Sequence, residues 1–198
     1  MKLSRKGEYA LRSLINLGFA GAAGRDLVQV TELAEVEQLP PKFLEQILYS
    51  LKEAGFVQSA RGKFGGYRLA KPSREIRIGD VVRLMDGPLA PIGCVSQSAY
   101  ERCTCPDEAH CGLRMLMLDV RNAIAGILDR YTLNDVVEVT LRKMRRDGLA
   151  IPFSEGEDAV PAPRLPARLA RKLARKAGRP DVSPAGGVLH HLLGDYSI

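Results

Sequence analysis

Apolar residues recur at three- and four-residue spacing along much of the chain, which is the period of a helix with one buried face. This pattern predicts helices at residues 4–20, 32–35, 41–54, 80–85, 113–131 and 133–146. Two short segments follow a different pattern. Residues 56–60 and 67–70 have the composition of strands, and the residues between them form a turn rich in glycine and basic side chains.

Residues that start or stop helices support these boundaries. Ser4 and Thr31 suit N-cap positions, and Gly55 stands where a left-handed residue ends a helix. Thr132, with Asp135 three residues later, has the spacing of a capping box. We therefore expect a separate helix to begin after Thr132.

The elements follow the order helix, turn, helix and then a basic two-stranded ribbon, which is typical of a winged helix-turn-helix. The expected fold class is mainly α with a small β-wing, followed by a long dimerisation helix. We divide the chain into a winged helix-turn-helix domain (1–87), a cysteine-rich loop (88–112), the long helix with a C-terminal helix (113–150) and a basic tail rich in proline and alanine (151–198). The composition of the tail predicts disorder.

The long helix carries an apolar seam. Its apolar positions step alternately by four and three residues, at Leu113, Met117, Val120, Ile124, Ile127 and Tyr131. This spacing is typical of a coiled coil and exceeds what a monomer of this size needs. We therefore expect a homodimer.

Composition narrows the class of protein. The chain has 198 residues, of which 45% are hydrophobic and 26% charged, as in globular proteins. No apolar run approaches the roughly 18 residues of a membrane span, and the first residues lack the apolar core of a secretory signal. We expect a cytoplasmic protein with reduced cysteines. The net charge of +6 and the pI of about 9.3 weakly favour a polyanionic partner.

The second helix of a helix-turn-helix enters the major groove of DNA with its N-terminal residues. The candidates for DNA contact on this helix are Lys42, Glu45, Gln46 and Tyr49. The wing adds Arg61, Lys63 and Arg68 on a glycine-rich hairpin that can approach phosphates closely. Alone, the helix could simply present a solvated polar face and the hairpin an incidental charge. Their succession favours double-stranded DNA as the partner.

The expected loop holds every cysteine of the chain, at Cys94, Cys103, Cys105 and Cys111. Thiols grouped in this way bind zinc or an iron–sulfur cluster, whereas buried structural cysteines usually occur singly. Cys103 and Cys105 are too close for both to ligate one iron comfortably, so the residues favour three cysteine ligands and a fourth ligand of another kind. Two alternatives stay open, namely unligated thiols and a zinc site.

The sequence offers little for catalysis. It contains no Ser/His/Asp arrangement, phosphate-binding loop or metalloprotease motif, and its only histidines are His110, His190 and His191. We therefore do not expect an enzyme.

Several of these segments together resemble the Rrf2 family of bacterial winged-helix transcriptional regulators, whose iron–sulfur sensors include IscR, NsrR and RirA. The resemblance covers residues 1–146. Its motifs are the opening Met-Lys-Leu-Ser-Arg-Lys-Gly-Glu-Tyr-Ala-Leu-Arg, residues 42–48, 51–55 and 57–61, the wing segment Gly65-Gly66-Tyr67-Arg68-Leu69-Ala70, residues 78–82 and Cys111-Gly112-Leu113-Arg114.

The resemblance implies a homodimer joined through the long helix and bound to a pseudo-palindromic promoter site, usually as a repressor. It implies one iron–sulfur cluster per subunit, in a two-iron or four-iron form, which would sense nitric oxide, redox state or iron supply. In the wing, Arg61 would contact DNA, and Glu45 of the recognition helix would influence site selectivity.

The cluster ligands implied by the resemblance are Cys94, Cys105 and Cys111, with Cys103 as an alternative middle ligand. This chain departs from the family pattern in a longer first gap and in its extra Cys103. The fourth ligand would be Glu8, as in relatives that use an acidic residue of the first helix, or His110, which precedes Cys111 where the family's histidine follows. The alternative function is a cluster-free winged-helix repressor whose cysteine loop is a thiol switch or binds zinc.

Overall fold

The computed structural model of the chain describes residues 2–62 and 64–154. Wing residue Lys63 and nearly all of the expected tail lie outside the described residues. The chain forms two compact units, one up to Val137 and one from Glu138 onward. The first unit contains every element discussed below except the end of the last helix.

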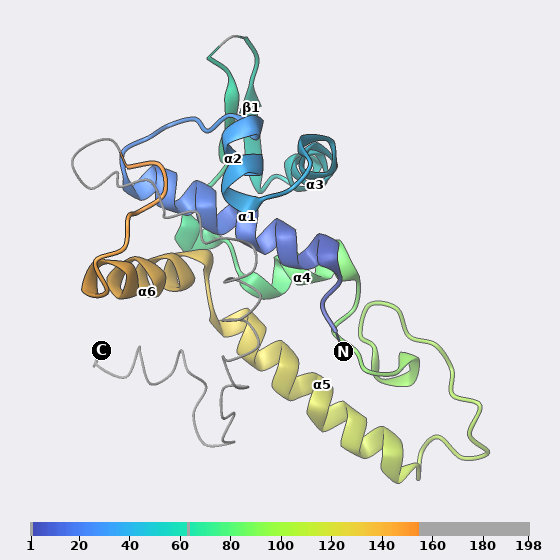
Figure 1. Cartoon of the computed structure of the whole chain (residues 1–198). Helices are drawn as coiled ribbons and strands as arrows, with labels where there is room; N and C mark the ends of the chain where they lie inside the picture. Colours follow the sequence, from blue (N-terminus) through green and yellow to red (C-terminus); the bar gives the residue numbers. More distant parts are fainter. Residues whose placement is uncertain (1, 63, 155–198) are drawn as a thin grey trace, which may run out of the picture. The chain divides into compact units, whose positions relative to one another are not determined.

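The elements are mainly helical (Figure 1). In chain order they are α1 (Arg5–Ala22), α2 (Val30–Glu37), α3 (Pro41–Glu53), β1 (Val57–Ala60), β2 (Gly66–Leu69), the 3-10 turn η1 (Ser73–Glu75), α4 (Ile78–Asp86), the 3-10 turn η2 (Gly93–Val95), α5 (Gly112–Arg130) and α6 (Leu133–Arg146). The predicted mainly α fold with a small β-wing is confirmed. Within the described residues, no helix is long and apolar enough to cross a membrane.

Most of the predicted helix boundaries are confirmed by the caps. The Ser4 hydroxyl accepts the Gly7 N–H at 3.0 Å, and Gly55 has a φ of 73° just after α3. The Asp135 carboxylate accepts the Thr132 N–H at 2.7 Å, and this capping box begins α6. The predicted cap at Thr31 is wrong.

Helix α2 begins two residues earlier than predicted, after Gln29. The Glu32 carboxylate accepts the Gln29 N–H at 2.9 Å, which fixes the first turn there. The preceding Val28 exchanges two backbone hydrogen bonds with Tyr67 of the wing, at 2.8 and 3.0 Å. The start of α2 is therefore set partly by a strand that is distant in sequence, which helical periodicity alone does not reveal.

The core of the first unit is formed by the apolar faces of α1 to α4, and strands β1 and β2 form an antiparallel hairpin beside α2 and α3 (Figure 1). The bulkiest completely buried side chains are Leu14, Leu33, Leu44, Ile47, Leu48, Leu51, Ile76 and Leu133. Burial of the periodic apolar positions thus holds the recognition helix α3 against α1 and α2 and leaves its polar face exposed.

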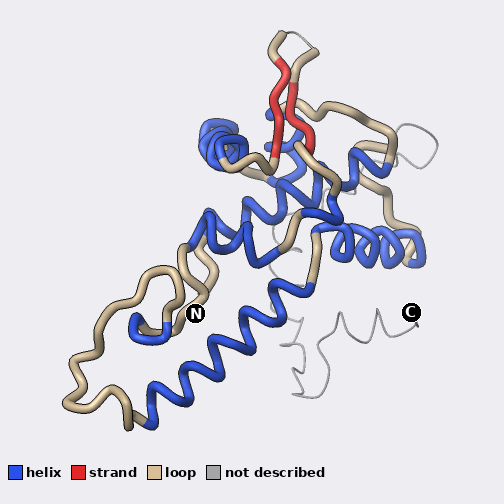
Figure 2. The backbone as a smooth tube through the Cα atoms, turned by 180° about the vertical axis from the view of Figure 1, so that it is seen from behind, coloured by secondary structure: helices blue, strands red, loops and turns tan. Residues whose placement is uncertain are grey.

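Helix α5 is the long helix that follows the cysteine loop (Figure 2). It contrasts with the other α-helices, because none of its residues is buried. Its C-terminal half packs on a cluster of Ile78, Val82 and Leu89 through Ile124, Leu128 and Tyr131. Its most exposed apolar residues are Leu113, Met115, Leu116 and Ile127. The predicted seam therefore needs correction, since two of its members, Ile124 and Tyr131, contact the core of their own chain.

Backbone hydrogen bonds also attach the end of α5 to the start of α4. The Ile78 N–H donates to the Tyr131 carbonyl at 3.0 Å, and the Leu133 N–H donates to the Ile76 carbonyl at 2.7 Å. In α4, the Arg83 guanidinium makes a two-point ion pair with Asp129 of α5, with both N···O distances at 2.7 Å. The C-terminal end of α5 is thereby fixed to the helix-turn-helix region.

Candidate DNA-binding surface and cysteine loop

Helix α3 presents its predicted DNA-contacting residues on one exposed face. Lys42, Glu45, Gln46 and Tyr49 are all accessible on this face, and the Tyr49 side chain is 62% exposed. Pro41 at the first position and the buried leucines of the opposite face explain this orientation. The amphipathic pattern predicted from the sequence therefore places these four side chains together.

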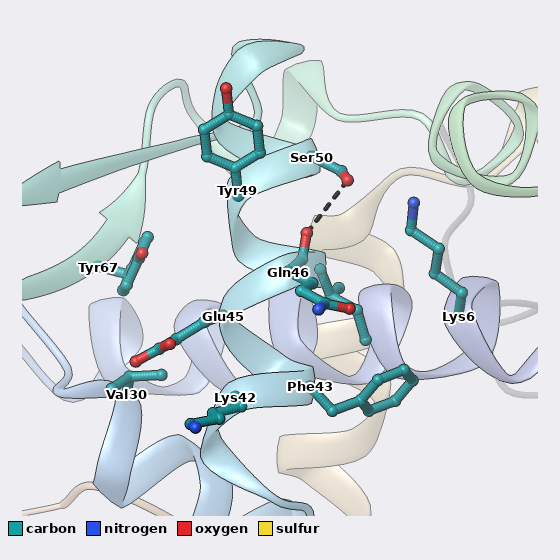
Figure 3. Close-up of a pocket in the computed structure, with 10 residues that line it drawn as sticks. Lys6, Val30, Lys42, Phe43, Glu45, Gln46, Tyr49, Ser50 and Tyr67 are labelled. Atoms are coloured by element: carbon teal, nitrogen blue, oxygen red, sulfur yellow. Dashed lines mark hydrogen bonds between the residues drawn. The ribbon is translucent and has the colours of Figure 1, made fainter.

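An open groove of about 800 Å³ lies along this face. Figure 3 shows Tyr67 of β2 on one side of α3 and Lys6 of α1 on the other. Burial raises the pKa of the Tyr67 phenol, and the nearby Glu45 carboxylate raises it further. Sequence reasoning did not assign Lys6 or Tyr67 to the site. The lysine follows Arg5 at the start of α1, and the tyrosine is part of the Gly-Gly-Tyr motif, so both positions carried a signal.

The wing residues differ in what they already contact. Arg61 is exposed beside a second hollow that Thr31 and Ser59 also line. Arg68 donates to both carboxylate oxygens of Asp26, at 2.9 and 3.0 Å. Its guanidinium is therefore committed to a neighbour within the chain, so Arg61 is the better placed of the two for a phosphate.

The four cysteines form a line of neighbouring thiols between η2 and α5. Cys94 is buried in η2, and Cys111 is the residue that precedes α5. The Cys94 side chain interacts with that of Cys103, and Cys103 Sγ accepts the Cys105 N–H at 3.2 Å. The Sγ atoms of Cys105 and Cys111 are 3.9 Å apart. All four are free thiols.

The thiols in this line differ in acidity because of their mutual hydrogen bonds. Hydrogen bonding from the Cys105 thiol and N–H lowers the pKa of Cys103. Hydrogen bonds to Cys103 and then to Cys111 raise the pKa of Cys105 to about 12. Burial, followed by the adjacent Cys103, raises the pKa of Cys94. Of the three thiols Cys94, Cys103 and Cys105, Cys103 is the one whose pKa is shifted downward.

Glu108 organises the polypeptide around these thiols. Its carboxylate accepts the Tyr100 hydroxyl at 2.8 Å and pairs with Arg114 Nε at 3.1 Å. It also accepts the backbone N–H of Cys103, and together these contacts lower the pKa of Glu108. Sequence reasoning missed this residue, because a glutamate in a polar loop has no distinctive spacing.

The two residues predicted as a fourth ligand have other partners. The Glu8 carboxylate is 3.7 Å from the Arg12 guanidinium one turn along α1. The His110 Nδ1 atom is 2.6 Å from the Asp107 carboxylate, and the His110 side chain is 83% exposed. Both side chains are thus engaged in local ion-pair geometry, whereas Cys103 contacts other thiols.

The four thiols supply the kind of donor atom that iron–sulfur clusters take. Among the described residues, no three His, Cys, Asp or Glu side chains converge on a point that would hold one metal ion. A cluster of several irons instead receives its cysteine thiolates on different irons. Four free thiols in one loop, two of them with Sγ atoms 3.9 Å apart, supply sulfur donors of this kind, so the chemistry of these residues fits an iron–sulfur group.

The sequence and the architecture both match those of known regulators. A family model named Rrf2 and described as an iron-dependent transcriptional regulator matches residues 3–139. An rrf2-like HTH-type transcriptional regulator of Rhodobacter capsulatus is 41% identical over 139 residues, which are 68% of this chain and 91% of that relative.

Two solved structures of similar proteins have the same fold. The structure of CymR, the global cysteine regulator of Bacillus subtilis, is similar with a TM-score of 0.58 and 31% identity, over 70% of this chain and 97% of that one. The structure of IscR of T. potens is similar with a TM-score of 0.55 and 28% identity, over 71% and 88% of the two chains. This chain therefore belongs to the Rrf2 family of winged-helix transcriptional regulators.

Proposed function

We propose that this chain is a homodimeric, DNA-binding repressor whose affinity for its promoters is controlled by an iron–sulfur cluster in the cysteine loop. The observation that carries the proposal is the line of four thiols directly before α5. Such a group of sulfur donors has no packing role, since only Cys94 is buried. The description of the matching family as iron-dependent supports the same interpretation.

The reading of DNA would follow from the exposed face of α3 and from the wing. Gln46 can pair with adenine and Glu45 can accept from cytosine in the major groove. Lys42, Tyr49 and Arg61 would contact phosphates, with Lys63 as a further candidate. Two copies of α3 would bind half-sites about 34 Å apart, the length of one turn of the duplex.

The second copy would pair through the free apolar residues of α5. Four large apolar side chains of this helix are each more than half exposed, namely Leu113, Met115, Leu116 and Ile127. So many exposed apolar side chains on one helix are typical of an interaction surface. Their burial in a dimer would fix the distance between the two α3 helices. The opposite end of α5 is attached to α4 by the ion pair of Arg83 with Asp129.

The cluster would be held by Cys94, Cys105 and Cys111, together with Cys103 or with Glu8 or His110. A bound cluster would supply a centre that nitric oxide, oxidation or iron shortage alters, in either the two-iron or the four-iron form. In this chain, the ligating thiols would fix the loop against the start of α5. A change in the loop would then bias the spacing of the recognition helices and so the affinity for paired half-sites.

The test is to purify the protein without oxygen and to measure iron, sulfide and visible absorption. DNA sites are then selected from a random duplex library, and the affinity for them is compared between cluster-loaded and cluster-free protein. We expect a brown protein and a difference of about tenfold or more for at least one class of site, within the usual range of allosteric coupling. A coloured protein that binds every site equally in both states would contradict regulation by the cluster.

A second candidate function is a cluster-free repressor with a thiol switch, or with zinc in the same loop. The 3.9 Å separation of the Cys105 and Cys111 Sγ atoms favours it, and so does the similarity to CymR, the global cysteine regulator. For this second function, we expect protein purified without oxygen to be colourless and free of iron. A small disulfide reagent would then join these two thiols in a disulfide, while its own disulfide is reduced to two thiols, and DNA affinity would change reversibly.

A further inference from the structure

We infer that Cys103 is itself a cluster ligand, so that the site of this chain consists of the four cysteines alone, without Glu8 or His110. The inference rests on the proposed function and specifies its ligand set. Cys103 then ligates the cluster together with Cys105 instead of replacing it. Its grounds are the position of Cys103, the engagement of the other candidates and the charges around the loop.

Cys103 occupies the middle of the line of thiols. Its side chain interacts with that of Cys94 on one side, and its Sγ accepts the Cys105 N–H at 3.2 Å on the other. Among the described residues, the thiol that links Cys94 to the pair formed by Cys105 and Cys111 is Cys103. A ligand set of Cys94, Cys105 and Cys111 would leave out Cys103, although Cys103 interacts with two members of that set.

The short spacing of Cys103 and Cys105 does not oppose this assignment. It hinders the binding of both thiolates to the same iron, whereas neighbouring irons of one cluster can each take one of them. The backbone N–H of Cys105 already points at Cys103 Sγ at 3.2 Å. An N–H donated to a ligating sulfur is a contact that tunes iron–sulfur clusters.

The non-cysteine candidates are less well placed. Using His110 would require its imidazole to leave Asp107, which is 2.6 Å away, and to turn inward from an exposed position. Glu8 is in the first helix and is 3.7 Å from Arg12. Cys103 already contacts the other thiols, so a fourth sulfur ligand needs the smaller rearrangement.

The surroundings can offset part of the charge of four thiolates. Cys111 stands at the N-terminal end of the long helix α5, where the unpaired N–H groups carry a partial positive charge. Arg114, in the first turn of that helix, adds a positive charge at the edge of the loop. Glu108 orients this arginine at 3.1 Å and also holds the backbone of Cys103.

The experiment compares single variants of the full-length protein that are reconstituted with iron and sulfide under argon. The test variants are Cys103→Ala and Cys103→Ser, and the matched controls are Glu8→Ala and His110→Ala. We expect cluster affinity to fall at least about tenfold in Cys103→Ala, because even the loss of an outer contact of a metal ligand costs that much. Both controls should keep the iron content and absorption of the wild type.

A Mössbauer spectrum of the unaltered protein tests the same point without any variant. Four cysteine ligands predict irons coordinated by sulfur only, whereas a carboxylate or imidazole ligand produces a distinct iron site. Circular dichroism of Cys103→Ala should match the wild type, so that a loss of iron is not a loss of fold.

The outcomes separate the two proposals. A wild type without iron would contradict the proposed function. A brown wild type with a brown, spectrally unchanged Cys103→Ala would leave the proposed function intact and overturn the assignment of Cys103. Loss of the cluster or of a distinct iron site in Glu8→Ala or His110→Ala would overturn that assignment as well.

Discussion

Different interactions stabilise the helix-turn-helix region and the cysteine loop, residues 88–111. The first is closed by completely buried side chains such as Leu14, Leu44 and Leu48. The second has few buried apolar side chains, among them Leu89 and Val95, and it also relies on contacts between thiols and on the polar contacts of Glu108. Closely packed apolar side chains keep one arrangement, whereas contacts between thiols change whenever the thiols are oxidised or ligated. We therefore expect the helix-turn-helix region to keep its structure when the thiols of the cysteine loop are oxidised or ligated, and the loop to change.

The largest expected effect would come from the core. Leu48→Ala should lower the free energy of unfolding by about 3 kcal/mol, because it leaves a cavity at a fully buried site. Cys105→Ala in the loop should cost no more than about 1 kcal/mol, and Tyr49→Ala on the exposed face should stay within about 0.5 kcal/mol of the wild type. Urea unfolding of the cluster-free protein measures all three. A loss in Cys105→Ala as large as that in Leu48→Ala would show that the loop belongs to the same core.

The sequence predicted the two regions unequally for the same reason. Periodic leucines and caps such as Ser4 and Thr132 determine local helices, so α1, α3 and α6 were predicted to within a few residues. The start of α2 was predicted two residues too late and with the wrong cap, because it depends on the pairing of Val28 with Tyr67, which are far apart along the chain. Short-range patterns do not contain such pairings.

The candidate sites follow the same division. The exposed residues of α3 could be assigned from helical spacing, because one buried face defines the other. Lys6 and Tyr67 reach the groove only through tertiary packing. In the loop, cysteine spacing indicated metal chemistry but not the neighbour of each thiol, and so it did not predict the central position of Cys103. Glu108 had no sequence signal at all.

The next effect concerns the wing. Arg61→Ala should weaken DNA binding about tenfold and reduce the slope of log affinity against log salt by about 1, as the loss of one phosphate contact does. Arg68→Ala should weaken binding less, because its guanidinium already pairs with Asp26. Fluorescence anisotropy with a selected duplex gives both values.

If the wing does not respond to the cluster, the losses of DNA affinity for Arg61→Ala and Arg68→Ala should be the same in cluster-loaded and cluster-free protein. A loss for Arg61→Ala that depends on the cluster would show that the loop reaches the wing. Equal losses for Arg61→Ala and Arg68→Ala would contradict the distinction drawn from the Asp26 pair.

A smaller effect is expected at the ion pair of Arg83 with Asp129, which joins α4 to the C-terminal end of α5. The pair is closely packed, because a Cβ added at the neighbouring Gly79 would overlap the Asp129 carboxylate. The hydrogen bonds from Arg83 lower the pKa of Asp129. Both side chains are about one-third exposed, so screening limits the pair to about 1 kcal/mol.

The sign of the pH effect follows from that direction. A carboxyl group whose pKa is lower in the folded state stabilises the fold above its unfolded pKa of about 3.9, and this contribution is lost as the pH falls through the folded value. Asp129→Asn should therefore be less stable than the wild type at pH 7 by about 1 kcal/mol. The two proteins should converge in acid, and urea unfolding at several pH values would reveal a constant gap if the ion pair is not responsible.

The smallest effect on overall stability, and the sharpest on the loop, is expected for Glu108→Gln. The amide keeps the shape of the side chain but loses the charge-assisted hydrogen bond from Tyr100 and the ion pair with Arg114. The global free energy of unfolding should change within about 0.5 kcal/mol, as for other changes outside the core. The backbone amides of Cys103 and Cys111 should exchange hydrogen faster, while peptides of α3 should not change. Glu101→Gln, in the same loop, is the matched control, and unchanged exchange in Glu108→Gln would mean that the thiol contacts alone hold the loop.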